Sequence, residues 1–232
     1  MDYHVFVADF LRYFRKRRMR TFFRLFAPQR VRTVLDVGGT AFIWDMYHDS
    51  TDVTLLNVDL PEKPSPQYKW VRGDGRHLHF RDGEFDLAFS NSVIEHVGEL
   101  DDQRRFAEEL RRVAKYVYCQ TPYKWFPVEP HFIVPFIHWL PLKWPYFVLR
   151  WFTVRGLVSR FDRESALEIR DHIRLMNEKE MRALFPDCDI CKERFLGMTK
   201  SLIAIRRSTP SRVEQAVSFY DRRGADVGRQ GS

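Results

Sequence analysis

The sequence predicts an α/β protein built on a doubly wound, mostly parallel sheet. Short apolar segments alternate with amphipathic helical patterns between residues 31 and 120. Several of these apolar segments end in Asp, Gly or Asn, residue types that suit the ligand-side loops of such sheets. Near the C-terminus, one helical pattern is followed by two strand patterns around a glycine turn. The sequence therefore predicts a seven-stranded sheet that closes with an antiparallel hairpin.

The composition fits a soluble globular chain with basic character. The 232 residues suit one α/β domain with additional segments, and the formal net charge is +7. This charge favours contact with an anionic membrane surface or an acidic substrate, and less so with nucleic acid, because no nucleic-acid module accompanies it. The three cysteines form no framework of pairs, and charges interrupt the N-terminal apolar pattern. We therefore expect a cytoplasmic protein that can lie peripherally at the inner face of the membrane.

The first 30 residues form a basic segment with aromatic residues at helical spacing. Two apolar stripes show this spacing: Tyr3, Phe6, Val7, Phe10 and Phe14, then Met19, Phe22, Phe23 and Phe26. The segment is predicted to form two short helices, or one helix bent near residues 15–18. Such a helix either caps the domain with its arginines in solvent or lies on an anionic membrane. We favour the cap.

The first strand pattern of the domain ends in a pair of glycines. Val34 to Val37 is a short apolar run that contains one acid, Asp36, and Gly38 and Gly39 follow it. Glycine allows a tight turn and a close approach of a ligand to the backbone. A helix is expected from about residue 41, with Phe42, Ile43, Met46 and Tyr47 on its inner face. By itself, this turn is compatible with a simple tight connection as well as with a ligand site.

Two further acids follow the next strand patterns. Residues 53–59 resemble a buried strand and end in Asp59, about twenty residues beyond the glycines, where an acid commonly accepts hydrogen bonds from ribose hydroxyls. Residues 68–71 predict a third strand that leads to Asp74. Asp74 is placed to accept a hydrogen bond from an adenine amino group. The alternative for both acids is a role in stabilising their turns.

The fourth strand pattern, residues 84–90, leads into a polar segment. Ser90, Asn91, Glu95 and His96 lie at or beyond its carboxyl end, which is the ligand side of an open α/β sheet. A long amphipathic helix is predicted from residue 101 to about residue 114, and a fifth strand over residues 115–120. These five strands and their connecting helices define the central part of the domain.

The ordered segments LDVGGT, NVDL, GDG, FDLAFSNSVIEHV and YVYCQTP resemble class I S-adenosylmethionine-dependent methyltransferases, in particular the methyltransferase type 11 group. The resemblance covers about residues 31–206 and implies a Rossmann-like fold, methyltransferase activity and S-adenosylmethionine as the cofactor. The glycine loop departs from the family pattern, because Thr40 and Phe42 stand at the later glycine positions.

The resemblance also implies which positions hold the cofactor. The glycine turn would bind its methionine part, and the acids after the second and third strands would bind the ribose and the adenine edge. The end of the fourth strand would line the transferable methyl. The residues at these matching positions are Asp36, Gly38, Gly39, Thr40, Asp59, Asp74, Ser90 and Asn91.

An aromatic and proline-rich insert, about residues 123–160, follows the fifth strand. Its prolines and charges argue against a regular membrane-spanning helix. It is predicted to form a hydrophobic lid or a membrane-dipping patch, with burial as ordinary core as the alternative. Tyr123, Trp125 and Phe126 are the candidate substrate contacts.

Three residues are candidates for a general base that removes a hydroxyl proton. His131 is the first choice because an imidazole titrates near neutral pH, and His96 and Glu129 follow. His96 can instead cap its turn, and Glu129 can pair with an arginine. We expect no metal site, because Cys188 and Cys191 have no second ligand pair.

Residues 177–185 predict a capped helix, residues 189–195 and 201–205 the closing hairpin, and residues 207–232 a disordered polar tail. The leading function is methyl transfer to a small-molecule or lipid-linked acceptor, at a hydroxyl oxygen. Two alternatives remain open from the sequence: a nicotinamide-dependent oxidoreductase, and a catalytically silent adaptor on the membrane surface.

Overall fold

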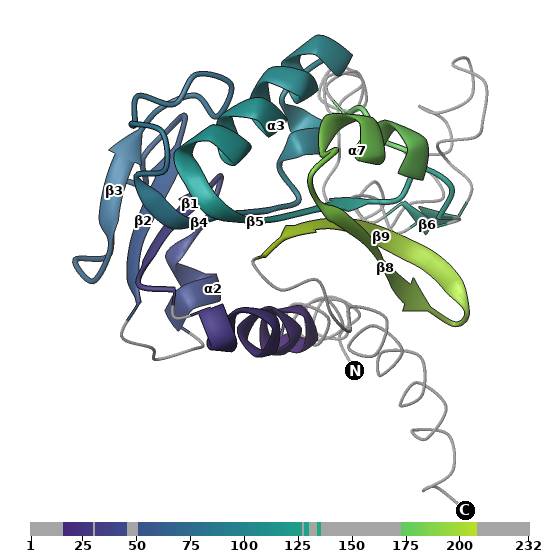
Figure 1. Ribbon diagram of the computed structural model, residues 1–232, viewed down its shortest axis with the longest axis horizontal. Coiled ribbons are helices and arrows are strands. Elements are labelled where there is room, and N and C mark those ends of the chain that lie inside the picture. The colour runs from purple at the N-terminus through teal and green to yellow at the C-terminus, as the bar shows by residue number, and fades with distance from the viewer. Residues whose placement is uncertain are drawn as a thin grey trace, which may run out of the picture.

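The computed structural model describes residues 16–29, 31–45, 51–126, 128–129, 134–135 and 173–207 (Figure 1). Its main element is a seven-stranded sheet with the strand order β3-β2-β1-β4-β5-β9-β8. In chain order the strands are β1 (Thr33–Val37), β2 (Asp52–Asn57), β3 (Lys69–Arg72), β4 (Phe85–Asn91), β5 (Ala114–Pro122), β8 (Asp189–Phe195) and β9 (Met198–Arg206). The helices are η1 (Ala27–Gln29), α2 (Ala41–Asp45), η2 (Ile94–His96), α3 (Leu100–Val113) and α7 (Glu178–Leu184).

The pairing of the strands confirms the predicted fold class. β3, β2, β1, β4 and β5 pair in parallel, whereas β9 pairs antiparallel with both β5 and β8. The chain runs outward from β1 to β3 and then returns to β4 on the other side of β1. In open α/β sheets, ligands bind beside such a reversal of strand order, which here lies at the carboxyl ends of β1 and β4. A small separate pair joins β6 (Val128–Glu129) to β7 (Val134–Pro135).

Helices α3 and α7 cover one face of the sheet (Figure 1). Phe106, Leu110 and Val113 of α3 are fully buried there, together with Met181 of α7. Apolar residues recur every three or four positions in α3, so that one stripe of the helix faces the sheet. In α7, the side chain of Asn177 accepts a hydrogen bond from the Glu180 backbone N–H and that of Glu180 accepts one from the Asn177 N–H. This reciprocal arrangement is the predicted capping box.

The opposite face is covered by α2 and by an N-terminal helix over residues 16–26. Met19, Phe22 and Phe26 of this helix are buried against strands β1, β4 and β5, as their spacing predicted. Phe22 makes edge-to-face contacts with Phe89 and Tyr118, among other rings. The N-terminal helix is therefore part of the hydrophobic core over these residues, which favours the cap interpretation for this part of the segment. Residues 1–15 lie outside the described part of the chain.

Several details differ from the sequence-based expectations. In α2 the buried residues are Ile43 and Trp44, whereas Phe42, predicted to face inward, is 42% exposed. Strand β2 ends at Asn57, so Asp59 lies two residues beyond it. Cys188 packs against the α3 face and Cys191 against the N-terminal-helix face, so the two thiols lie on opposite sides of the sheet. In the described ranges, no helix is long and apolar enough to cross a membrane.

Candidate active site at the carboxyl edge of the sheet

The predicted cofactor residues gather at one edge of the sheet. Asp36 lies near the carboxyl end of β1, Asp59 and Asp74 follow β2 and β3, and Asn91 ends β4. These strands are parallel, so their carboxyl ends meet at the same edge. Residues separated by more than fifty positions in the chain are thereby brought to one side of the molecule.

The glycine turn after β1 is tightly fitted to its surroundings. Gly38 has a φ of +79°, a conformation that favours glycine, and a Cβ there would lie 2.4 Å from a methyl group of Val93. A Cβ at Gly39 would lie 1.9 Å from Oδ2 of Asp36. The Asn57 side chain donates to the Gly39 carbonyl at 2.7 Å and fixes the turn from β2. Both glycines are therefore required by the local geometry.

Asp36 is an acid buried in an apolar setting. The side chain is 1% exposed, and its Oδ2 accepts a hydrogen bond of 2.7 Å from the Trp44 indole. Its Oδ1 has no hydrogen-bond partner among the described residues. Burial raises the pKa of Asp36 to about 7, and the hydrogen bond from Trp44 opposes part of this rise. A cationic group beside Oδ1 would satisfy this carboxylate.

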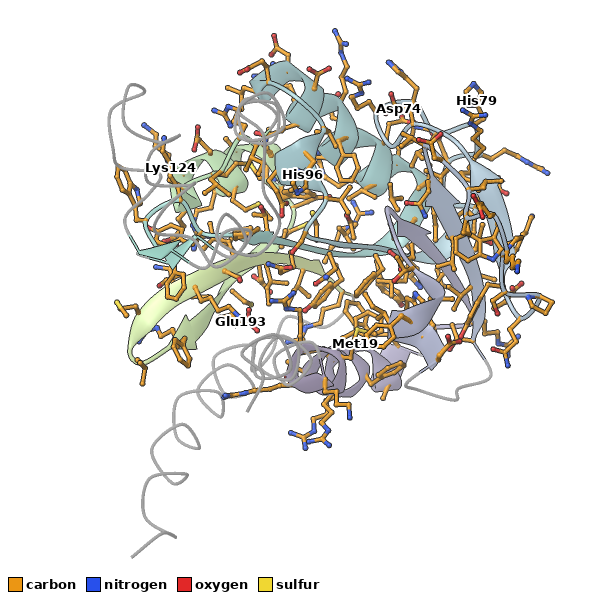
Figure 2. All side chains as sticks on the ribbon, turned by 180° about the vertical axis from the view of Figure 1, so that it is seen from behind. Met19, Asp74, His79, His96, Lys124 and Glu193 are labelled. Carbon is orange, nitrogen blue, oxygen red and sulfur yellow. The ribbon has the colours of Figure 1, made fainter. Side chains whose placement is uncertain are left out.

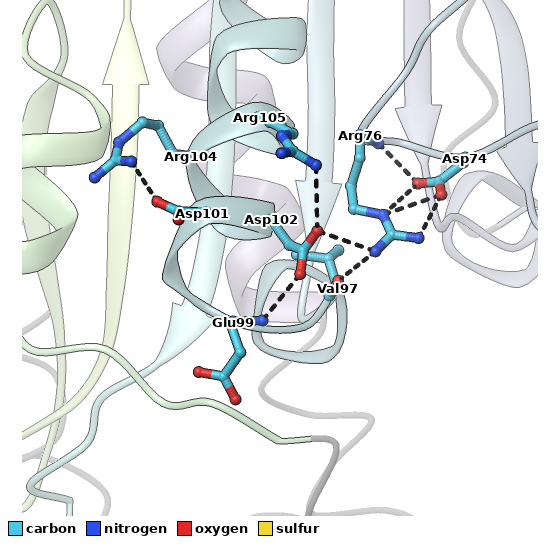
Figure 3. Close-up of polar contacts among 8 residues, drawn as sticks. All are labelled: Asp74, Arg76, Val97, Glu99, Asp101, Asp102, Arg104 and Arg105. Atoms are coloured by element: carbon cyan, nitrogen blue, oxygen red, sulfur yellow. Dashed lines mark hydrogen bonds and ion pairs between the residues drawn. The ribbon is translucent and has the colours of Figure 1, made fainter.

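Asp59 and Asp74 differ in how firmly they are held. Asp59 is exposed and forms a 3.3 Å ion pair with Arg72, whose side chain is also exposed. Asp74 accepts bonds from the backbone N–H and the guanidinium of Arg76, and Arg76 also reaches Asp102 of α3 (Figure 3). The hydrogen bonds from Arg76 lower the pKa of Asp74, against the effect of burial. Oδ1 of Asp74 accepts from the Arg76 backbone N–H and Nε, and Oδ2 accepts from Nε and Nη2, so Arg76 engages both carboxylate oxygens.

Ser90 and Asn91 have different roles at the end of β4. Ser90 is fully buried, and its hydroxyl donates to the Val37 carbonyl at 3.2 Å, which ties β4 to β1. Asn91 is half-buried, and its Oδ1 accepts a hydrogen bond from Arg18. The next residue, Ser92, has a left-handed φ of +58°. The structure thus assigns Ser90 a tie between strands and leaves Asn91 as the more accessible residue.

His96 ends η2 just beyond β4 and is exposed (Figure 2). His131 lies outside the described residues, as does the side chain of Glu129, so their predicted roles remain predictions. At the start of the insert, Tyr123 is half-buried and Phe126 is 6% exposed. Trp125 is 52% exposed, and the Lys124 ammonium lies 5.6 Å from its ring centre.

Residues 123–124, at the start of the insert, lie beside residues 174–176, where the described chain resumes. The Lys124 N–H donates to the Met176 carbonyl at 3.1 Å, and Tyr123 and Met176 form a parallel bridge. The Arg174 N–H donates to the carbonyl of Glu95, the residue before His96. The chain therefore enters the segment that contains the insert, and returns from it, between the ends of β5 and η2.

Some residues of this edge were missed by the sequence analysis. Trp44 and Asn57 hold the glycine turn, and Arg18 and Gln120 form a buried polar group beside Asn91. A tryptophan or an amide within a strand–helix pattern is indistinguishable from an ordinary core or loop residue by spacing alone. The run of arginines at residues 15–18 was interpreted as solvated charge, and no sequence signal singled out Arg18.

Comparison with known families decides between the functional classes. Residues 32–116, from the start of β1 to β5, match the family model of a methyltransferase domain. This part of the chain is a class I S-adenosylmethionine-dependent methyltransferase domain. Its cofactor is therefore S-adenosylmethionine, as the resemblance implied. The chain has no significant match among curated proteins.

Solved structures resemble the methyltransferase at the level of the fold. A protein from Rhodobacter sphaeroides described as a putative Zn-dependent alcohol dehydrogenase has a TM-score of 0.51 and 13% identity, over 80% of this chain and 88% of that one. N-methyltransferase NodS from Bradyrhizobium japonicum, crystallised with S-adenosyl-L-homocysteine, has 0.48 and 12%, over 85% and 87%. A SAM-dependent methyltransferase from Methanosarcina mazei has 0.44 and 16%, over 75% and 90%.

These comparisons do not support the two alternatives. At 13% identity, the likeness to a protein described as a dehydrogenase shows a shared fold and no shared activity. In the portion of the chain that the structure describes, no group of three His, Cys, Asp or Glu side chains is placed to hold a metal ion.

The residues present fit the cofactor of the family. Asp36 offers a buried carboxylate oxygen that lacks a partner within the described ranges, and the methionine part of the cofactor carries an ammonium group. The glycine turn beside it leaves no room for a side chain at residues 38 and 39. Asp59, which is exposed, can accept hydrogen bonds from hydroxyl groups, whereas both oxygens of Asp74 are already engaged by Arg76.

Proposed function

We propose that the methyltransferase transfers a methyl group to a hydroxyl oxygen of a small-molecule or lipid-linked acceptor. The observation that carries this proposal is where the chain enters and returns from the segment that contains the aromatic and proline-rich insert. Residues 123–124, at the start of the insert, lie beside residues 174–176, between β5 and η2 and near the carboxyl end of β4. An insert of this composition at that place suits an acceptor with an apolar part. Tyr123, Trp125 and Phe126 are its first contacts in this proposal.

The cofactor residues follow from the geometry of the edge. Asp36 and the backbone of Gly38, Gly39 and Thr40 would hold the methionine part, Asp59 the ribose hydroxyls and Asp74 the adenine edge. Asn91 would line the methyl group, and Ser90 would support it by tying β4 to β1. S-adenosylmethionine supplies a methyl group that its sulfonium already activates. The protein therefore needs only to align the acceptor and to remove its proton.

Binding of S-adenosylhomocysteine tests these contacts. Asp59→Ala removes the exposed carboxylate and one partner of an exposed ion pair, so the fold is expected to persist. Calorimetry should show binding to the wild type that becomes about tenfold weaker in the variant. Asp52→Ala, an exposed acid at the other end of β2, is the matched control. Equal affinity in all three proteins would remove Asp59 from the site.

Three residues are proposed as general bases, with His131 first and His96 and Glu129 next. A screen of hydroxyl compounds and lipid-linked sugars with labelled S-adenosylmethionine identifies the acceptor. With that acceptor, His131→Asn, His96→Asn and Glu129→Gln are compared for the pH dependence of kcat. In the variant that lacks the base, kcat should no longer fall as the pH drops below neutral, and this change identifies the base. A labelled product whose methyl is on nitrogen or carbon would contradict the hydroxyl assignment.

We also propose that the outer face of the N-terminal helix contacts an anionic membrane surface from the cytoplasmic side. Lys16, Arg20 and Arg24 lie four residues apart and are exposed, whereas Met19 and Phe22 face the core. This orientation leaves one basic stripe on the outside of the protein, in keeping with the net charge of +7.

Vesicle flotation tests this surface. Deleting residues 16–26 would remove buried core residues, so substitution is the better design. The variant Lys16→Gln, Arg20→Gln, Arg24→Gln keeps the apolar face and should float with vesicles rich in phosphatidylserine much less than the wild type. The control removes three exposed basic residues elsewhere: Lys63→Gln, Lys69→Gln, Arg81→Gln. Equal flotation of the two variants would exclude the helix as the membrane contact.

A further inference from the structure

The N-terminal helix places a buried arginine among the ends of three strands. Arg18 is 7% exposed and donates to Oδ1 of Asn91 at 2.5 Å, to Oε1 of Gln120 at 2.7 Å and to Oε2 of Glu193 at 2.8 Å. Asn91 and Gln120 are direct neighbours in the β4–β5 register, and Glu193 belongs to β8. Figure 2 shows Glu193 next to this helix, which also carries Met19. One side chain therefore joins the helix to the carboxyl ends of β4 and β5.

Stability alone does not account for a charged pair at this position. The hydrophobic cluster on this face consists of aliphatic and aromatic residues, and Glu193 is only 2% exposed. Burial favours the neutral form of Glu193, but the charges of Arg18 and Lys200 hold its pKa below the ordinary value, so it is ionised. Burying both charges costs desolvation energy that a well-packed apolar pair would not. The arrangement is explained better by what the arginine orients.

Arg18 determines which way two carboxamides point. A guanidinium has only donors, so Asn91 and Gln120 must present their oxygens to it. The Gln120 oxygen also accepts from the Ser92 hydroxyl at 3.0 Å, which fixes it from a second side. The amide NH2 of Asn91 is then left as the donor available to a ligand at the end of β4. Without Arg18, this carboxamide would be free to rotate.

We propose that Arg18 is a positioning residue for the cofactor site, acting through the orientation of Asn91. This inference rests on the proposed role of Asn91 beside the methyl group. Arg18 itself does not contact the cofactor. It fixes the donor that does, and so makes the N-terminal helix part of the catalytic arrangement, although this helix precedes the matched residues 32–116.

A double-mutant cycle tests this coupling, with S-adenosylhomocysteine as the probe. Arg18→Lys keeps the charge but loses the planar fork, and should weaken binding about tenfold by calorimetry. In the Asn91→Ala background the same change should weaken binding by less than about threefold. Arg20→Lys, on the exposed side of the same helix, should have no effect.

The possible results distinguish failure of the role proposed for Arg18 from failure of the cofactor assignment on which it rests. Equal losses in both backgrounds, or a lowered Tm with unchanged affinity, would mean a purely structural arginine and would overturn the inference. A wild type that fails to bind S-adenosylhomocysteine would overturn the assignment of the cofactor residues, and the inference with it. If Arg18→Lys bound S-adenosylhomocysteine as tightly as the wild type and Arg18→Met bound it more weakly, a positive charge alone would suffice. That result would overturn the role of the planar guanidinium.

Discussion

The two faces of the sheet solve the same packing problem with different chemistry. The α3–α7 face is mainly aliphatic, centred on Phe106 and Leu110, and has one buried acid beside it, Glu95, which accepts a hydrogen bond from Thr121. The face under the N-terminal helix holds an aromatic cluster, and towards its carboxyl edge it buries charged groups, namely Asp36, Arg18 and Glu193. An apolar face needs only complementary shape, whereas buried charges add an energetic cost. The comparison indicates that the face under the N-terminal helix buries more charge near the candidate site than the α3–α7 face does.

The largest expected loss of stability comes from a substitution on the α3–α7 face, called the apolar face below. Phe106 is fully buried, and a Cβ at Gly75 would lie 2.4 Å from its ring. Phe106→Ala should lower the free energy of unfolding by about 3–5 kcal/mol, because it leaves a cavity between α3 and the turn after β3. Urea denaturation measures this change. Phe42→Ala, at a residue that is 42% exposed, should cost far less.

The contact between Phe106 and Gly75 also provides a check on the cavity explanation. Gly75→Ala alone should destabilise the protein because its methyl group meets the ring. In the Phe106→Leu background the same substitution should cost less, since the smaller side chain makes room. Strict additivity of the two changes would show that the ring and the glycine are not in direct packing contact.

The next substitution is expected to raise the free energy of unfolding, and it lies on the face under the N-terminal helix. The pKa of Asp36 is raised from 3.8 to about 7 in the folded protein. Between these values the folded state holds a proton that the unfolded state has lost, so Asp36 lowers stability as pH rises, by at most about 4 kcal/mol above pH 7. Asp36→Asn keeps an acceptor for Trp44 and should therefore stabilise the protein at about pH 8.

The test compares urea unfolding of both proteins at two pH values, in the absence of cofactor. The advantage of Asp36→Asn should be small at about pH 4 and should grow up to about pH 8. The same variant should lose binding of S-adenosylhomocysteine, because the amide cannot pair with the ammonium group. A variant that is less stable at all pH values would contradict the raised pKa.

The sequence was more informative about the apolar face than about the charged one. The spacing in α3, the capping box of α7 and the closing hairpin were all predicted, because periodicity and capping are local properties of the chain. The acids and glycines at strand ends were also found, since an open α/β sheet brings these ends together.

What was missed depends on contacts between distant positions. Arg18 meets Glu193 across 175 residues, and no local pattern encodes that pairing. Phe42 was expected inside because it shares a helical face with Ile43, Met46 and Tyr47, but Trp44 takes the inner position and donates to Asp36. Local hydrophobicity cannot tell which of two neighbouring aromatic residues will find a buried acceptor.

The smallest expected effect belongs to the local capping of α7 on the apolar face. The Asn177 side chain accepts from the Glu180 N–H at 3.0 Å, one of the donors that the first turn of a helix leaves unpaired. Asn177→Ala should lower the free energy of unfolding by about 1 kcal/mol, and Asn177→Gly by only a few tenths. Lys179→Ala, at an exposed position of the same turn, is the control. Burial raises the pKa of Glu180, the other member of this cap, but the hydrogen bonds from the Asn177 N–H and Arg174 bring it below the ordinary value. Glu180 is therefore ionised throughout, and the loss should be nearly independent of pH between about 6 and 8, unlike the effect of Asp36→Asn. A loss at Asn177 that changes over this pH range would contradict the assignment of its effect to the cap alone.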